Sequence, residues 1–97
     1  MSAAHLYLVA YDIASPRRWR RVYKTMCRSG ERRQFSVFLC RLNEARMARL
    51  KAKLGGLVDA EEDRLMVVDL GPSASAEARL QGSGPEAGEA LAWPLVI

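Results

Sequence analysis

The sequence contains few of the side chains from which most enzyme active sites are built. It has one histidine, His5, and two cysteines, Cys27 and Cys40, which form no CxxC pair. These numbers argue against a Ser–His–Asp triad, an HExxH zinc site and a disulfide framework. Neither a GxxxxGK(S/T) phosphate loop nor a GxGxxG dinucleotide motif is present. We expect both cysteines to be small core residues.

Long apolar runs are also missing. No stretch approaches the roughly 18 uninterrupted apolar residues of a membrane-spanning helix, and the first residues lack the basic region and apolar run of a secretion signal. The 97 residues are 49% apolar and 27% charged, which is ordinary for one globular domain. We therefore expect a cytoplasmic protein with no membrane segment.

Positive charge is concentrated in the first part of the chain. Residues 1–56 carry 13 Lys or Arg and 3 Asp or Glu, which gives a net charge of +10. Residues 57–97 carry 2 Lys or Arg and 8 Asp or Glu, which gives a net charge of −6. A basic half is typical of proteins that bind phosphates. It is equally typical of solvated helix faces, so composition alone leaves both interpretations open.

The first two elements are a strand and a helix. Residues 5–11 are apolar on both faces, which predicts a central strand. Ser15 and Pro16 then give the start signals of a helix over residues 16–29, which Gly30 ends. Its apolar stripe has helical spacing and consists of Trp19, Val22, Tyr23, Met26 and Cys27.

Residues 31–42 alternate in polarity as a strand does, and form either one long strand or two short ones joined by a bend near Ser36. Asn43 can cap a second helix, which Gly55 and Gly56 end or fray. The inward residues of that helix are Met47, Leu50, Leu54 and Leu57. Residues 64–70 predict a last short strand, closed by Gly71 and Pro72.

This order predicts an α+β, ferredoxin-like βαββαβ domain over residues 1–72, with a four-stranded antiparallel sheet and both helices on one face. Residues 73–97 form a C-terminal extension. Within it, residues 73–90 are small and polar and predict an irregular connector. The apolar end LAWPLVI predicts a short edge strand that pairs with its own sheet or with a partner at a dimer interface.

Carboxylates are the remaining candidates for chemistry. Residues 61–63 have the pattern of a solvated turn, and Asp69 could be structural or functional. Asp12 directly follows the central strand, where functional groups often sit on a rigid base, although a turn or capping role fits as well. One carboxylate is a poor Mg²⁺ site. In a twofold homodimer, Asp12 and its symmetry mate could share Mg²⁺ or Mn²⁺ and hydrolyse a phosphodiester.

Residues 6–70 contain, in order, the strand LYLVAYDI, a basic helix start, RRQFSVF, a second helix, an EED turn and a last strand. In this order and spacing they resemble the second universal family of CRISPR-associated proteins. Members are the small ferredoxin-like subunits of the spacer-acquisition complex, also called CRISPR-associated endoribonucleases. The resemblance implies a homodimer that works with the integrase subunit. It also implies metal-dependent endonuclease activity, on RNA in some members and on DNA in others.

The family's site residues can be carried over by motif. Tyr11 and Asp12 match its active-site YD pair, with Asp12 as the metal ligand. Arg21, Arg32 and Phe38 match positions linked to cleavage: the arginines would hold phosphate and Phe38 would pack beside the site. Two residues depart from the family's pattern. Leu39 stands where many members have an acidic or small polar residue, and Trp19 stands where several nuclease-active members have another arginine.

Two main functions therefore compete. The first is the endonuclease, acting on single-stranded RNA or double-stranded DNA. The second is a non-catalytic scaffold between integrase dimers that grips a DNA duplex through its backbone. An mRNA-cleaving toxin of similar fold and a ferredoxin-like small-molecule sensor are further alternatives. The side chains expected to contact nucleic acid are Arg17, Arg18, Arg20, Arg21, Lys24, Arg32 and Arg33.

Overall fold

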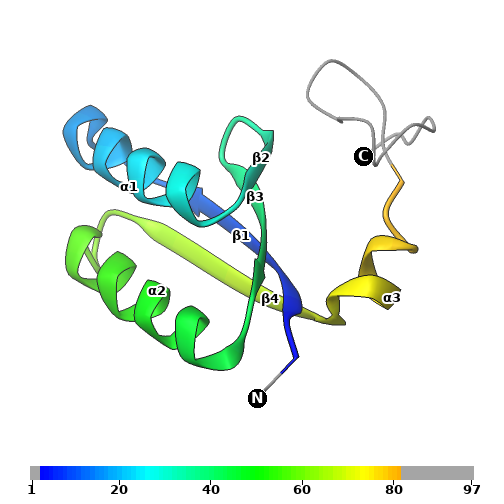
Figure 1. Cartoon of the computed structure of the whole chain (residues 1–97). Coiled ribbons are helices and arrows are strands. Elements are labelled where there is room, and N and C mark those ends of the chain that lie inside the picture. The colour runs from blue at the N-terminus through cyan, green and yellow to red at the C-terminus, as the bar shows by residue number, and fades with distance from the viewer. Residues whose placement is uncertain (1–2, 82–97) are drawn as a thin grey trace.

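The structure is a computed structural model that describes residues 3–81. The elements in this part of the chain are β1 (His5–Asp12), α1 (Pro16–Ser29), β2 (Glu31–Gln34), β3 (Val37–Leu42), α2 (Glu44–Leu57), β4 (Arg64–Pro72) and α3 (Ser73–Glu77). The four strands form one antiparallel sheet in the order β2-β3-β1-β4 (Figure 1). This order confirms the predicted α+β, ferredoxin-like fold.

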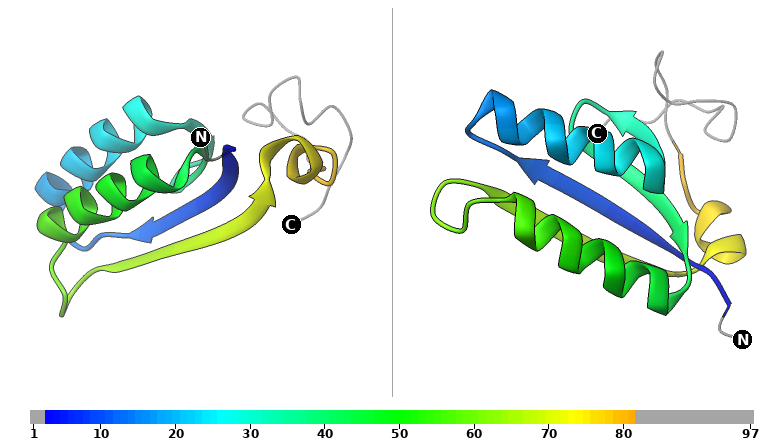
Figure 2. Two further views of the ribbon diagram at one scale, coloured as in Figure 1. Left: turned by 60° about the horizontal axis from the view of Figure 1, so that its bottom comes forward. Right: turned by 60° about the vertical axis from the view of Figure 1, so that its left-hand side comes forward.

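The helices α1 and α2 lie on the same side of the sheet (Figure 2). They enclose the main core, whose largest fully buried side chains are Phe38, Met26, Met47, Leu54, Val9, Val22 and Cys40. β1 is an interior strand, as predicted, and lies between β3 and β4. Because side chains alternate along a strand, Tyr7, Val9 and Tyr11 face the helices, while the residues between them face the other way.

Both helix starts follow their sequence signals. The Ser15 hydroxyl accepts a hydrogen bond from the Arg18 N–H at 3.3 Å, and Pro16 is the first residue of α1. Asn43 Oδ1 accepts a hydrogen bond from the Arg46 N–H at 2.8 Å. Each cap satisfies one of the backbone donors that a helix N-terminus leaves without an intrahelical partner. The start of each helix therefore agrees with its local capping signal.

Two predictions about the helices are wrong. α2 continues through Gly55 and Gly56 to Leu57, because Leu57 packs against the core and gives the last turn a buried contact. Cys27 is exposed, whereas Cys40 is buried. Cys27 stands at the edge of the apolar stripe of α1, where the helix surface already turns toward solvent.

Residues 31–42 form two strands and not one. Phe35 and Ser36 make the turn between β2 and β3, which confirms the alternative with a bend near Ser36. The pairing of the two strands shifts by one residue between Arg32 and Gln34. Such a bulge changes the direction of the side chains that follow it.

The end of the described chain differs from the prediction. β4 extends to Pro72, and Ser73–Glu77 form α3 where an irregular connector was expected. Ala76 of α3 packs against Leu6 and Leu39 on the sheet face opposite α1 and α2, and this buried contact stabilises the short helix. The predicted terminal strand over residues 91–97 lies outside the described residues.

The sheet face opposite α1 and α2 is only partly covered by α3. A hollow of about 430 Å³ opens there. Met66 and Val68 are 54% and 37% exposed, although both are large and apolar. We call this region the open sheet face and define it as Leu8, Ala10, Val37, Leu39, Met66 and Val68. None of the helices in the described part of the chain is long and apolar enough to cross a membrane.

Candidate active site and nucleic-acid interface

Asp12 is the last residue of β1, and its side chain is exposed. In the antiparallel pairing of β1 with β4 it stands opposite Arg64. Because side chains alternate along a strand, Asp12 shares its face with Ala10 and Leu8 of the open sheet face. The carboxylate therefore lies at the end of the open sheet face, on the side away from the helices.

Tyr11, the neighbour of Asp12, points into the core. Its side chain is 5% exposed, its ring stacks on Phe38 with 6.1 Å between ring centres, and its hydroxyl has no hydrogen-bond partner among the described residues. Burial raises the pKa of Tyr11 to about 12. The hydroxyl is therefore protonated near neutral pH, and the ring packs against Phe38 at the end of β1.

Five aromatic rings run from the end of β1 to the surface; we call them the aromatic array. Their order is Tyr11, Phe38, Tyr23, Trp19 and Phe35. The ring centres of Tyr23 and Phe38 are 6.0 Å apart, edge to face. Trp19 stacks on Tyr23 and on Phe35, with 5.0 Å between ring centres in each pair. The array begins beside Asp12 with a buried ring and ends with Phe35, which is 65% exposed.

The two arginines assigned to the site by resemblance, Arg21 and Arg32, lie in different places, and so does Arg33, which was expected to contact nucleic acid. Arg32 donates a hydrogen bond from Nη1 to the Tyr23 hydroxyl at 3.3 Å and so adjoins the aromatic array. Arg33 pairs with Glu31 at 2.7 Å and lines the hollow of the open sheet face. Arg21 is exposed on α1. The structure brings Tyr11, Phe38 and Arg32 into one connected cluster but does not bring Arg21 into it.

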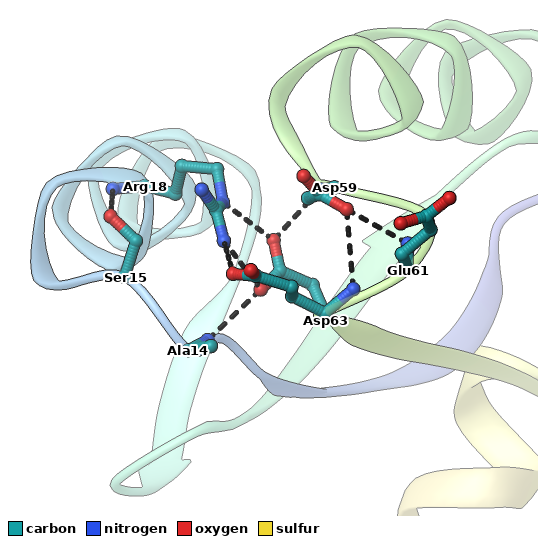
Figure 3. Close-up of polar contacts among 7 residues, drawn as sticks. Ala14, Ser15, Arg18, Asp59, Glu61 and Asp63 are labelled. Carbon is teal, nitrogen blue, oxygen red and sulfur yellow. Dashed lines mark hydrogen bonds and ion pairs between the residues drawn. The ribbon is translucent and has the colours of Figure 1, made fainter.

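The side chain of Asp63 is 0% exposed, so the prediction that residues 61–63 are a solvated turn is wrong at this position. Its carboxylate accepts hydrogen bonds from the Ala14 N–H at 2.9 Å and the Asp59 N–H at 2.8 Å. It also accepts two from the Arg18 guanidinium, at 2.8 and 3.2 Å (Figure 3). These bonds, first of all the one from Arg18, hold the pKa of Asp63 well below its usual range. Asp63 thereby fastens the loop that follows Asp12.

The Asp63 contact changes the role of Arg18. Its guanidinium also donates to Glu62 at 3.1 Å, so two carboxylates occupy it. An arginine held by two carboxylates has fewer donors left for a phosphate. We therefore assign Arg18 to the support of the loop and leave it out of the proposed nucleic-acid surface.

The remaining cations of α1 form an exposed strip, which continues onto α2. None of its members has an ion-pair partner within residues 3–81. Between the helices, Arg28, Arg46, Arg49 and Lys53 line a groove of about 420 Å³. We call this region the basic helix surface and define it as Arg17, Arg20, Arg21, Lys24, Arg28, Arg46, Arg49 and Lys53. It covers the side of the molecule opposite the open sheet face.

The residues of one chain supply only part of a metal site. Within the described residues, no three His, Cys, Asp or Glu side chains are grouped so that they could hold a metal ion. Mg²⁺ is usually bound by one or two carboxylates together with water and substrate phosphate. Asp12 fits such a site when a second carboxylate, from another copy of the chain, or a nucleic-acid phosphate completes it.

Three residues at or near this site were not identified from the sequence. Arg64 stands opposite Asp12, but only the register of β4 reveals it. Asp63 acts through partners far away in the chain, so no local pattern marks it. Phe35 had a usable signal, because a large aromatic residue in a tight turn is unusual and points to a packing or binding role.

Comparison with known proteins places these features in a family. The family model described as CRISPR associated protein Cas2 matches residues 5–77. The chain is 43% identical over 83 residues to CRISPR-associated endoribonuclease Cas2 1 of Rhodospirillum rubrum, covering 86% of this chain and 81% of that protein. It is 51% identical over 70 residues to a CRISPR-associated endoribonuclease Cas2 of Thermus thermophilus, covering 71% of this chain and 74% of that protein.

A solved structure agrees with these matches. The crystal structure of Streptococcus pyogenes Cas2 superposes with a TM-score of 0.72 at 30% identity, covering 81% of this chain and 99% of that one. The matched residues 5–77 include the whole sheet, Asp12 and the basic helix surface. The fold and the relatives thus agree that the chain belongs to the Cas2 family of CRISPR-associated proteins.

Proposed function

We propose that this Cas2-family chain acts as a homodimer in the acquisition of CRISPR spacers, where it binds nucleic acid and hydrolyses phosphodiester bonds with Mg²⁺ or Mn²⁺ held at Asp12. The observation that carries the proposal is the place of Asp12. It is an exposed carboxylate at the end of an apolar sheet face that residues 3–81 leave partly open.

The open sheet face supports the homodimer. Its hollow is lined mainly by apolar side chains. Two large apolar side chains of this face, Met66 and Val68, are exposed. Contiguous apolar surface of this kind favours association in water. A twofold interface uses the same patch on both copies. Pairing through the open sheet face would therefore bring Asp12 of each copy to the rim of one interface.

The chain's own residues have separate tasks in the proposed site. Mg²⁺ or Mn²⁺, when bound, would polarise the phosphodiester and lower the pKa of a coordinated water. Asp12 would bind the ion, and Arg64, opposite it on β4, would offer a cation to a phosphate oxygen. Tyr11 and Phe38 hold the strand end in place through their stacked rings.

Single-stranded RNA is the substrate class we propose first, because the relatives from R. rubrum and T. thermophilus are named endoribonucleases. Double-stranded DNA is the second. Both carry the phosphates that the basic helix surface would contact through the backbone, without reading bases.

Substitution of Asp12 tests the proposal. Asp12→Ala and Asp12→Asn should abolish cleavage of labelled RNA or DNA in the presence of Mg²⁺ or Mn²⁺, while binding of the same oligonucleotides remains within about twofold, because phosphate contacts dominate affinity. Glu61→Ala is the control, since Glu61 is also an exposed acid but lies in the turn before β4, and it should cleave normally. Normal cleavage by Asp12→Ala would disprove the assignment of Asp12.

The basic helix surface favours a second function, the non-catalytic scaffold between integrase dimers. Its eight cations extend over both helices, far more than a single scissile phosphate needs. A duplex backbone lying along this surface would be held without cleavage and with steep salt dependence. In that function the integrase subunit would be the partner, and Asp12 would be dispensable.

Charge reversal tests the scaffold. Arg17→Glu with Arg21→Glu should weaken duplex binding by at least about tenfold at low salt and reduce the slope of affinity against salt concentration. Arg18 stays unchanged because it supports the loop at Asp63. Lys51→Glu is the control, because Lys51 is exposed on α2 but lies away from the groove between the helices. Equal losses in both variants would reject the basic helix surface as the binding site.

A further inference from the structure

Phe35 is the most exposed of the large apolar side chains in the described part of the chain, at 65%. Its ring nevertheless has a fixed neighbour, because it stacks on Trp19 with 5.0 Å between ring centres and 18° between ring planes. One part of the ring is thus packed against α1 while the rest stays in solvent. An aromatic ring held in this way offers a flat surface for stacking.

The support behind Phe35 is rigid. Trp19 also stacks on Tyr23 at 5.0 Å and 9°, and Tyr23 packs edge to face on the fully buried Phe38. The turn that carries Phe35 is joined to β1 by a 3.1 Å hydrogen bond from the Tyr11 N–H to the Ser36 carbonyl. The ring is therefore held in place before any ligand arrives, which reduces the entropy lost on binding.

Phe35 does not belong to the open sheet face. It contacts Trp19 of α1, on the helix side of the sheet, whereas Met66 and Val68 belong to the opposite face. A second copy that covers the open sheet face would not explain why Phe35 is exposed. The two exposed apolar regions call for two different occupants.

The surroundings of Phe35 are cationic. Arg20 directly follows Trp19 and stands three residues before Tyr23 on α1, so it flanks the stacked rings on the helix surface. Arg32 also adjoins Tyr23, with its guanidinium carbon 5.8 Å from the ring centre. A ligand suited to both the flat ring and the cations carries a planar aromatic group and negative charge, as a nucleotide does.

We propose that Phe35 stacks with an unpaired nucleobase of single-stranded RNA or DNA, next to the end of β1 that carries Asp12. This inference rests on the proposed nucleic-acid function and adds to it a preference for unpaired strands. A base inside a duplex is already stacked on both sides and cannot use the ring without leaving the helix. The phosphates flanking the stacked base would meet Arg20 and the basic helix surface.

Stacking can be separated from general electrostatic binding by comparing variants at one position. Phe35→Leu keeps an apolar side chain but removes the stacking surface, while Phe35→Trp keeps the stacking surface.

The probes are short single-stranded RNA and DNA oligonucleotides containing 2-aminopurine, whose fluorescence falls on stacking, and a blunt duplex of the same length. We expect Phe35→Leu to lose about tenfold in single-strand affinity and to lose the fluorescence quenching. Phe35→Trp should keep both, and duplex affinity should not change in either variant.

Several results would overturn the inference. They are unchanged single-strand binding by Phe35→Leu, equal losses for single strand and duplex, or a change in oligomeric state on size-exclusion chromatography, which would make Phe35 an interface residue. Failure of the proposed function looks different, because Asp12→Ala would then cleave normally whatever the Phe35 variants do. Equal losses of affinity with the RNA and the DNA oligonucleotides support stacking on a base of either strand type. No loss of affinity with either oligonucleotide rejects the inference.

Discussion

Asp63 accepts two hydrogen bonds from the Arg18 guanidinium, at 2.8 Å from Nε and 3.2 Å from Nη2, across 45 positions of sequence. The same carboxylate accepts the N–H of Ala14, two residues after Asp12. One buried side chain thus joins the loop before β4 to the loop that follows the proposed metal ligand (Figure 3). This contact between distant segments holds the loop that begins directly after Asp12.

Substitution of Asp63 should destabilise the fold. Asp63→Asn keeps the shape of the side chain but removes the charge that Arg18 contacts and turns one acceptor into a donor facing other donors. We expect a melting temperature several degrees lower, measured by circular dichroism. Glu62→Gln is the matched control, because Glu62 is exposed and its ion pair with Arg18 is at the surface, so its melting temperature should barely change. Equal effects would show that Asp63 is not the residue that joins the loops.

The Asp63 contact also predicts a dependence of stability on pH. The pKa of Asp63 is lower in the folded chain than its usual value of about 3.9, mainly through the hydrogen bond from Arg18. The carboxylate therefore stabilises the fold fully above pH ~4, and this contribution is lost as the pH falls toward the folded-state pKa. Urea midpoints between pH 7 and pH 2.5 should fall less for Asp63→Asn than for the wild type.

Asp69 contributes to the acid sensitivity in the same direction. Its pKa is lowered first by the Gly71 N–H and then by the His5 side chain. Asp63→Asn should therefore reduce the acid sensitivity without removing it, and Asp63→Asn combined with Asp69→Asn should reduce it further. Identical pH profiles for the wild type and the double variant would contradict both assignments.

Two glycines should respond oppositely to alanine. A Cβ at Gly30 would overlap the Leu39 carbonyl oxygen and Cys40 Sγ, where β3 passes directly beside the end of α1, so Gly30→Ala should destabilise the fold. Gly55 lies inside α2 with open space around its Cα, so Gly55→Ala should raise the free energy of unfolding by about 0.5–1 kcal/mol. Urea denaturation measures both. Loss of stability in Gly55→Ala would contradict the helix over Glu44–Leu57.

The two cysteines should differ in reactivity. Cys27 is exposed, whereas burial raises the pKa of Cys40 to about 11 and shields its sulfur from reagents. At pH 8 an aromatic disulfide reagent should modify Cys27 quickly in the native protein and Cys40 only after denaturation. Cys27→Ser should therefore give no fast phase, and a fast phase that persists in it would contradict the burial of Cys40.

Features set by local chemistry could be predicted from the sequence. The start of α1 at Pro16 follows from the Ser15 cap, and the central position of β1 follows from its two apolar faces. Asp12 was identified because a strand end is visible in the pattern of residues.

Features set by distant partners could not be predicted. The burial of Asp63 depends on Arg18 and Ala14, and the exposure of Cys27 depends on how far the neighbouring elements cover α1. Arg33 and Gln34 are adjacent in β2 and would point to opposite faces of a regular strand, but both line the hollow of the open sheet face, where the pairing shifts at the bulge. Side-chain direction after a bulge depends on pairing that no short segment encodes.

Mixed dimers test most directly whether two copies of Asp12 form the one metal-dependent site that we propose. Wild type and Asp12→Ala are refolded together in varied proportions, and cleavage is measured with Mg²⁺ or Mn²⁺. If both carboxylates are needed, only wild-type homodimers cleave, and an equal mixture of subunits retains about a quarter of the activity. Independent sites would retain about half, and this result, or a wild type that cleaves neither RNA nor DNA, would contradict the account.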